Sequence, residues 1–268
     1  MNHPKVSLII TTWLESSKKY LDLCIESVRN LNYDLDSLEV LIIGKKSYQP
    51  QYAGCKTIAP DSDQFYPAHG INFGMRHASP DSKYFFICND DVILTQNCLT
   101  RLVDFTRENK ILVNPTSPCD NGTACHLIFG FYNQKKQFVQ MPHTSYTYEQ
   151  LAPVAIDLMN AESLYPAGLV RQYFLCIYAT LIPRIAYEAI GEWDEGFKTG
   201  QDDLDYSLRA KEKGFECVTC LDALVWHFSG VTVEKTLNPQ MRRDNIMYFK
   251  NKWNFWPPGI NQESFDKI

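Results

Sequence analysis

Short apolar runs alternate with longer amphipathic stretches in the early part of the chain. Val6 to Thr11 and Leu38 to Ile43 are rich in aliphatic and β-branched residues, as buried parallel strands are. Leu21 to Leu31 places apolar residues at helical spacing, and Gly70 to Ala78 predicts a second helix before a third apolar run at Tyr84 to Cys88. The order strand, helix, strand, helix, strand predicts a parallel sheet with helices on both faces.

The rest of the chain has a less regular pattern. Between Thr116 and about Pro166 it is rich in polar and turn-forming residues, and loops of this length in a compact domain tend to be functional. The other predicted elements are helices at 99–108, 184–190, 204–213 and 241–256, a strand at 111–113 stopped by Asn114-Pro115, short strands such as 124–131, an apolar segment at 174–182, and an extended strand pair at 215–228.

The third apolar run ends in Asn89-Asp90-Asp91 and turns apolar again at Val92. Ionised groups at the edge of a core cost desolvation energy unless they are paired. Ligands bind at the carboxyl ends of parallel strands, and two carboxylates with an amide oxygen suit Mg²⁺ or Mn²⁺ held together with substrate phosphates. The alternative is a polar loop in which Asn89 or Asp90 caps the next helix.

A second acidic cluster, Asp202-Asp203-Leu204-Asp205, stands at the start of the predicted helix 204–213. Acids in the first turn of a helix can simply match its dipole. Capping needs one or two of them, and crowding three raises the pKa of at least one toward the value that a general base needs. Asp205 and Arg209 are four residues apart, so they can form an ion pair along the helix. We favour a catalytic role for this cluster.

His227 follows an apolar run and ends the predicted extended region. A single histidine at a strand end is more often a structural residue than a ligand. A neutral imidazole suits Mn²⁺, however, and a metal bound by Asp91 would need a further protein ligand. His227 is therefore a second candidate ligand.

Composition limits the class of protein. The chain has 268 residues, 45% of them hydrophobic, and a net charge of −5, which argues against nucleic-acid binding. Nine cysteines are scattered through apolar segments, as in the reduced core of a cytoplasmic protein. No segment has the pattern of a signal peptide or a membrane-spanning helix. We expect a cytoplasmic protein that does not require membrane association.

The motifs occur in an order that resembles the inverting family 2 glycosyltransferases with the GT-A fold, in their rhamnosyltransferase-like branch. The matching segments are Val6 to Trp13, Ala68-x-x-x-Asn72-x-Gly74-x-x-x-Ala78, Asn89-Asp90-Asp91-Val92, one block that runs from Ile182-Pro-Arg184 through Gly191 to Glu195 and on to Asp202-Asp203-x-Asp205-x-x-x-Arg209, His227 to Gly230, and Arg242 through Asn245 to Trp253. Each motif is weak alone, but six in the right order are quite specific, and together they cover residues 6 to about 255.

The resemblance implies an α/β fold with a GT-A, Rossmann-like, mostly parallel sheet flanked by helices and a small antiparallel acceptor-side part. It implies one domain, residues 1–268, with a nucleotide-sugar-binding half at 1–115 and an acceptor-side half with the C-terminal helix at 116–256. The implied reaction moves a sugar from a nucleoside-diphosphate sugar to a hydroxyl of a glycan or lipid-linked acceptor, with inversion, as in polysaccharide biosynthesis.

The resemblance also assigns residues to roles. Asp203 is the implied base, with Asp202 as the alternative. Mn²⁺ or Mg²⁺ is held by Asp91 and His227, with Asn89 as a weaker ligand. The implied donor-binding residues are Thr11, Thr12, Trp13, Glu15, Asn72, Asn89, Asp90 and Arg242, and Arg243 is an alternative to Arg242.

Two departures keep other functions open. The family usually has an aspartate after its second strand to read the nucleotide base, whereas this chain has Gly44-Lys45-Lys46, so Asp61 or Asp63 can take that role or none does. Asp202 stands where the family usually has glutamate. The alternatives are a non-catalytic sugar-nucleotide-binding protein, a galactosyltransferase-type enzyme and a metal-dependent phosphohydrolase.

Overall fold

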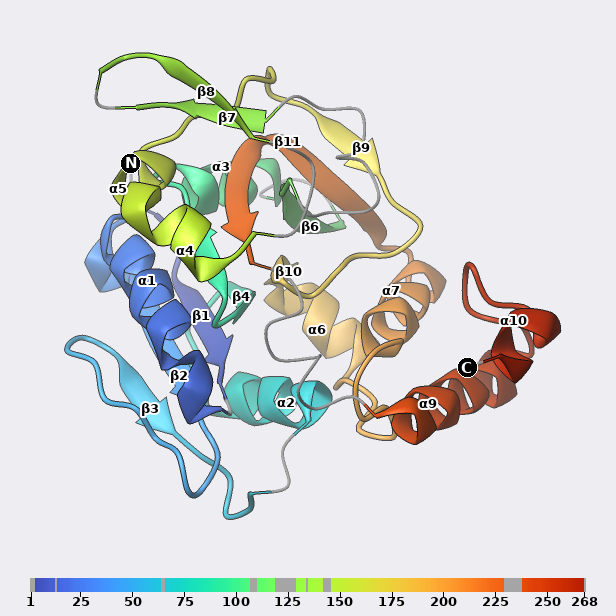
Figure 1. Cartoon of the computed structure of the whole chain (residues 1–268). Helices are drawn as coiled ribbons and strands as arrows, with labels where there is room; N and C mark the ends of the chain where they lie inside the picture. The colour runs from blue at the N-terminus through green and yellow to red at the C-terminus, as the bar shows by residue number, and fades with distance from the viewer. Residues whose placement is uncertain are drawn as a thin grey trace.

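The computed structural model describes residues 3–12, 14–63, 66–106, 110–118, 129–133, 135–141, 146–228 and 238–267. In this part of the chain, nine strands form one sheet in the order β3-β2-β1-β4-β10-β6-β11-β5, with β9 paired to β11 (Figure 1). The strands are β1 (Val6–Thr11), β2 (Leu38–Ile43), β3 (Lys56–Ile58), β4 (Tyr84–Asn89), β5 (Val92–Leu94), β6 (Ile111–Thr116), β9 (Leu169–Arg171), β10 (Ala179–Pro183) and β11 (Glu216–His227).

The sheet combines parallel and antiparallel pairing. Strands β3, β2, β1 and β4 are parallel, and β6 is parallel to β11. Strand β10 is antiparallel to both of its neighbours, β4 and β6, and β5 is antiparallel to the end of β11. A separate hairpin consists of β7 (Phe129–Tyr132) and β8 (Phe138–Met141). The predicted α/β fold with a small antiparallel part is confirmed.

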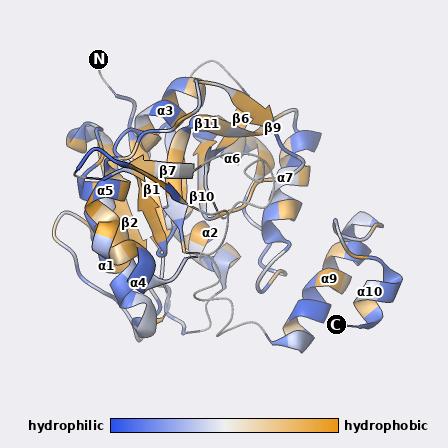
Figure 2. Cartoon of the chain, turned by 45° about the horizontal axis from the view of Figure 1, so that its top comes forward, coloured by the Kyte–Doolittle hydropathy of each residue, from blue (hydrophilic) through white to orange (hydrophobic). Residues whose placement is uncertain are grey.

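Helices cover both faces of the sheet because successive strand residues point to opposite sides. Leu8 and Ile10 pack with α1 (Lys18–Arg29) and α3 (Cys98–Thr106), while Ile9 lies in the opposite cluster with α2 (Pro67–His77), α6 (Arg184–Ile190) and α7 (Asp202–Glu212). Both clusters are buried, and the strands carry the hydrophobic colours in Figure 2. The order predicted from the apolar periodicity is therefore confirmed for this part of the sheet.

The remaining helices lie at the margins of the sheet. Helices α4 (Tyr148–Leu151) and α5 (Ala155–Met159) pack with β5 and the end of β11 in a third apolar cluster. Helices α9 (Pro239–Trp253) and α10 (Gln262–Asp266) project beside α7 (Figure 1). Among the described residues, no helix is both long and apolar enough to cross a membrane.

Two sequence predictions about strands are wrong. Strand β6 does not stop before Asn114-Pro115 but continues to Thr116. The pairing with β11 continues past the proline, with Thr219 opposite Asn114 and Cys220 opposite Pro115, so the strand extends beyond the predicted stop. The predicted strand pair at 215–228 is a single strand, β11, whose first part pairs with β6 and whose end pairs with β5, with a register shift between Cys220 and Leu224.

Candidate active site

The first part of the site lies where β1 and β4 end side by side. After β1 the chain continues to β2 on one side, and after β4 it continues to β5 toward the opposite end of the sheet. The strand order therefore reverses between β1 and β4, and α/β sheets bind ligands at such a switch point. The Thr12 and Ser17 hydroxyls donate hydrogen bonds of 2.6 and 2.9 Å to Asp90 Oδ2. Burial, together with the neighbouring Asp91 carboxylate, raises the pKa of Asp90 to about 7. Asp90 therefore holds the chain after β1 against the end of β4.

Asp91 and His227 meet although they are far apart in sequence. Strand β5 pairs with β11 in a register that places His227 opposite Val92, and the Phe228 N–H donates a 3.0 Å hydrogen bond to the Asp91 carbonyl. As a result, His227 Nε2 lies 3.3 Å from Asp91 Oδ1, with both side chains largely buried. The Tyr178 ring stacks on the imidazole at 5.0 Å between centroids and fixes its plane.

This pair fits a small divalent cation. Neighbouring ligands that are each about 2.1 Å from an ion, at right angles, stand about 3 Å apart, close to the observed 3.3 Å. Carboxylate oxygen and imidazole nitrogen are suitable donors for Mn²⁺ or Mg²⁺. No group of three or more metal-binding side chains occurs in the described part of the chain. Two protein donors suit an ion whose other ligands are phosphate oxygens and water.

The second part of the site is the start of α7. Gln201 precedes the helix with a φ of 62°, and its side chain makes no capping hydrogen bond. Asp202 is 5% exposed and its Oδ2 atom has no hydrogen-bond partner, whereas the Asp203 side chain is partly exposed. Burial raises the pKa of Asp202 to about 6, and burial with repulsion from Asp202 raises that of Asp203 to about 7. These values suit general-base catalysis near neutral pH.

Asp205, the third acid of this cluster, has a structural role. It is fully buried and accepts hydrogen bonds from Arg209 Nε at 2.9 Å and from Trp253 Nε1 at 2.9 Å, with Lys252 Nζ at 2.6 Å. The predicted pair between Asp205 and Arg209 is confirmed. Because Lys252 and Trp253 belong to α9, Asp205 fixes the C-terminal helix to the turn that carries Asp203.

A short segment connects the two parts of the site. The Ser207 hydroxyl donates a 2.7 Å hydrogen bond to the Asp203 carbonyl and accepts one of 3.0 Å from the Leu175 N–H. Three residues further on, the Tyr178 carbonyl accepts a 2.9 Å hydrogen bond from the Asn89 N–H at the end of β4. Three residues of chain span at most about 11 Å. The helix that carries Asp203 and the Asp91–His227 pair are therefore joined through one short segment, residues 175–178.

Asn72 connects α2 to the loop before α7. It is fully buried, its Nδ2 donates to the Trp193 carbonyl and to Glu195 Oε1, both at 2.9 Å, and its Oδ1 accepts from the Trp193 N–H at 2.8 Å. The ring of Trp193 in turn stacks on Tyr206 of α7 at 4.0 Å. Both the oxygen and the nitrogen of the Asn72 amide are hydrogen-bonded to the loop before α7. Asn72 therefore positions α7.

The other predicted donor-binding residues have varied surroundings. Thr11 is a buried strand residue, Glu15 is exposed in a short 3-10 helix, and Arg242 is exposed on α9. Asn89 makes backbone contacts, including acceptance from the Cys88 thiol at 3.3 Å. Trp13 lies outside the described residues.

Three further acidic or basic residues named in the sequence analysis have partners elsewhere. Asp61 pairs with Lys46 at 2.6 Å, and Asp63 accepts a 2.7 Å hydrogen bond from the Ser47 N–H. The guanidinium of Arg243 lies over the Phe265 ring of α10.

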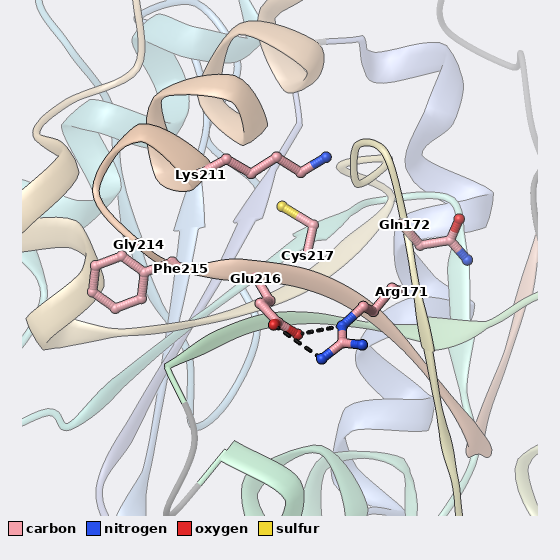
Figure 3. Close-up of a pocket in the computed structure, with 7 residues that line it drawn as sticks. All are labelled: Arg171, Gln172, Lys211, Gly214, Phe215, Glu216 and Cys217. Carbon is pink, nitrogen blue, oxygen red and sulfur yellow. Dashed lines mark hydrogen bonds and ion pairs between the residues drawn. The ribbon is translucent and has the colours of Figure 1, made fainter.

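A separate surface pocket of about 450 Å³ lies at the opposite end of β11 from His227 (Figure 3). An exposed ion pair crosses it, with Arg171 Nε 2.8 Å from Glu216 Oε2. The pocket is lined by Arg171, Gln172, Lys211, Gly214, Phe215, Glu216 and Cys217. It contains none of the predicted site residues.

Sequence reasoning missed Ser17, Tyr178 and Ser207. These residues act through contacts with Asp90, His227 and Asp203, which are distant in sequence or one helical turn away. Ser207 carried a usable signal, because it is four residues after Asp203 on the predicted helix. Tyr178 carried none, because its stacking on His227 depends on the placement of β10.

The mostly parallel sheet with helices on both faces has the GT-A fold. One similar solved structure is GalNAc-T7 with UDP, GalNAc and Mn²⁺, which has a TM-score of 0.58 and 12% identity over 83% of this chain and 43% of that chain. Another is the mannosyltransferase PcManGT from Pyrobaculum calidifontis with GDP-Man and Mn²⁺, with a TM-score of 0.59 and 13% identity over 96% of this chain and 66% of that chain. A third is TarS from S. aureus, with a TM-score of 0.58 and 11% identity over 98% of this chain and 42% of that chain. The chain thus spans less than two thirds of each of these proteins.

The chain belongs to glycosyl transferase family 2, whose sequence model matches residues 7–161, more than half of the 268 residues. No curated protein sequence matches the chain. The family assignment therefore rests on the sequence model, and the similarity to solved structures supports the fold.

Proposed function

We propose that this protein is a metal-dependent, inverting glycosyltransferase. It would transfer a sugar from a nucleoside-diphosphate sugar to a hydroxyl group of a glycan or lipid-linked acceptor. The observation that carries the proposal is the 3.3 Å approach of Asp91 and His227, connected through residues 175–178 to the helix of Asp203. The family match and two neighbours that were solved with a nucleotide or nucleotide sugar and Mn²⁺ support it.

In this proposal, Asp91 and His227 bind the metal at the end of β4, and residues 1–115 hold the donor. The bound cation supplies positive charge that offsets the charge of the departing diphosphate. Asp90 has a different task, because its Oδ2 atom is already bonded to Thr12 and Ser17. It keeps the loop after β1 in place beside the ligand pair. Asn89 is assigned a weaker contribution to the same metal.

We assign Asp203 as the general base. Solvent reaches part of its side chain, whereas Asp202 is 5% exposed. Asp203 takes the proton of the acceptor hydroxyl as that oxygen forms its bond to the anomeric carbon, and the bond from this carbon to the diphosphate breaks on the opposite face. Attack from the opposite face inverts the configuration of the sugar. The acceptor would bind on the side of residues 116–256.

The test is release of nucleoside diphosphate from a panel of nucleoside-diphosphate sugars, including a rhamnose donor, with and without Mn²⁺ and in the presence of glycan acceptors. We expect turnover with one donor. Asp91→Asn should lose this activity, and added metal should no longer change it. Asp203→Asn should lose activity but retain donor binding. The exposed Asp81→Asn serves as a matched control. NMR of the product would show the inverted anomeric configuration.

Three outcomes would contradict parts of this proposal. Donor binding without nucleoside-diphosphate release, with every acceptor, would indicate a binding protein. Full activity in Asp203→Asn and loss in Asp202→Asn would move the base to Asp202. Release of inorganic phosphate rather than a nucleoside diphosphate would indicate a phosphohydrolase.

A further inference from the structure

The loop before α7, residues 194–201, ends in a turn with two consecutive residues in the left-handed region. Gly200 has a φ of 85° and Gln201 a φ of 62°. Glycine adopts this conformation without strain, whereas a residue with a side chain does so at a cost and only where its surroundings hold it. Asp202 and Asp203 follow directly, so the placement of these acids depends on how the turn is held.

Asn245 binds the backbone just before this turn from α9, the helix that lies beside α7 in Figure 1. Its Oδ1 accepts a 3.0 Å hydrogen bond from the Lys198 N–H, and its Nδ2 donates a hydrogen bond to the Thr199 carbonyl. The Asn245 side chain is 1% exposed. A carboxamide carries an acceptor and a donor, so one side chain satisfies both backbone groups. Asn245 thereby fixes the two residues that precede the turn.

The beginning of the same loop is held in a similar way by a second asparagine. Asn72 of α2 bonds to both the carbonyl and the N–H of Trp193, at 2.9 and 2.8 Å. Next to it, Asp194 accepts hydrogen bonds from the Tyr248 hydroxyl at 3.1 Å and from Lys252 Nζ at 2.6 Å, both on α9. The loop is therefore held at both ends by buried amide side chains from two different helices.

The turn is connected to the acids through the backbone. Burial raises the pKa of Asp202, and hydrogen bonds from backbone N–H groups, that of Gly200 among them, lower it. On the other side of the turn, the Asp205 N–H donates a 2.9 Å hydrogen bond to the Gln201 carbonyl, which begins α7. A displacement of Gly200 would therefore move both Asp202 and the start of the helix.

Other contacts attach α9 to the domain without Asn245. A buried apolar cluster of Phe197, Leu204 and Phe249 joins the loop, α7 and α9. The contacts of Asp205 with the end of α9 join the two helices a second time. Loss of the Asn245 carboxamide would therefore free the backbone before the turn while the helix stays in place.

We propose that Asn245 is a positioning residue for sugar transfer, which holds the strained turn before α7 so that Asp203 meets the acceptor hydroxyl. This inference rests on the proposed function. Both polar groups of the Asn245 amide are bonded to the loop, so its effect on the reaction passes through the loop. A misplacement of about 1 Å can lower a rate about a hundredfold. The donor is assigned to the other part of the site, at the ends of β1 and β4.

The test compares two variants of Asn245 with one of Asn238, the residue that caps the start of α9. Asn245→Ala removes both hydrogen bonds to the loop, and Asn245→Asp removes the one to the Thr199 carbonyl. Asn238→Ala removes the hydrogen bond to the Met241 N–H, which weakens the same helix at its cap. The full chain is assayed with Mn²⁺ for kcat by nucleoside-diphosphate release, for donor affinity by calorimetry, and for melting temperature.

We expect the kcat of Asn245→Ala to fall about tenfold to a hundredfold, with unchanged donor affinity. Asn245→Asp keeps the acceptor for the Lys198 N–H, so its kcat should lie between those of Asn245→Ala and the wild type. All three variants should melt a few degrees lower than the wild type. Asn238→Ala should nevertheless keep the wild-type kcat, so that the rate falls only where the contact with the loop is lost.

A wild-type kcat in both Asn245 variants would overturn this inference and leave the glycosyltransferase proposal intact. Equal losses of kcat in Asn238→Ala and Asn245→Ala would also overturn it, because the rate would then follow the stability of α9. So would a loss of donor affinity as large as the loss of kcat. If Asn245→Ala does not fold, the comparison of Asn245→Asp with Asn238→Ala decides. If the wild type released no nucleoside diphosphate with any donor, the proposed function and this inference would both fail.

Discussion

The two acids at the start of α7 should make the folded protein less stable as the pH rises from about 4 to about 7. Their folded-state pKa values, about 6 for Asp202 and about 7 for Asp203, are above the ordinary value of 3.8. In this window the folded state binds protons that the unfolded state has released. The free energy of unfolding therefore falls with rising pH and levels off above about pH 7.

The magnitude follows from the rise in pKa. Each unit corresponds to about 1.4 kcal/mol, so a rise from 3.8 to about 7 would cost about 4 kcal/mol if Asp203 were wholly buried. Solvent reaches part of this side chain and screens its charge, which lowers the expected cost to about 2 kcal/mol. Asp203→Asn removes this titration and keeps an acceptor oxygen for the Leu204 N–H.

The assay is urea or thermal unfolding of the wild type and Asp203→Asn between pH 4 and pH 8, without metal or donor. We expect the variant to gain about 2 kcal/mol relative to the wild type over this range, or about 4–8 °C in melting temperature. The exposed Asp81→Asn should show no such change. Parallel curves for the wild type and Asp203→Asn would refute the view that α7 holds a carboxylate with a raised pKa.

Three further predictions concern the same framework. Because a base must be ionised, the rate of sugar transfer should rise about tenfold per pH unit below the pKa of Asp203, about 7, and then level off. A flat profile from pH 5 to 8 would contradict the assignment of Asp203 as the base. Trp253→Phe removes a hydrogen-bond donor to the buried Asp205, so the free energy of unfolding measured in urea should fall by about 1–3 kcal/mol. An unchanged midpoint would show that this contact of α9 does not stabilise the fold. Gly74→Ala would place a Cβ atom 2.5 Å from Ile9 Cγ2, so the same measurement should show a cost of about 1–3 kcal/mol, and a stable variant would mean that α2 can move off the sheet.

The sequence predicted the elements whose signal is local. The apolar runs at Val6–Thr11 and Leu38–Ile43 are strands with the predicted bounds, and Gly191 and Gly214 follow α6 and α7 with positive φ. Helix α1 begins at Lys18, three residues before the apolar pattern starts, because its first turn is polar. Local periodicity defines a buried face, and it defines the ends of an element less well.

Sequence reasoning proposed the acids of the candidate site and missed the residues that position them. The residue types at Asp91, Asp203 and His227 carry a chemical signal of their own in the sequence. The role of Tyr178, and the contact of Ser207 with Leu175, arise only when β10 is inserted beside β4, and no local pattern records that pairing. The number of donors around Asp205 is likewise a tertiary property, because two of them come from α9.

The antiparallel insertion of β10 explains why the two acidic clusters can form one site. In a purely parallel sheet, the segment before a strand would start at the edge away from the ligand. Strand β10 runs in the opposite direction, so its start, at Ala179, is opposite Cys88 near the carboxyl end of β4. The chain just before it, Leu175 to Tyr178, therefore lies at this edge of the sheet and contacts both His227 and Ser207 of α7. Strand β10, which comes from the second half of the chain, is thus paired in space with β4 from the first half.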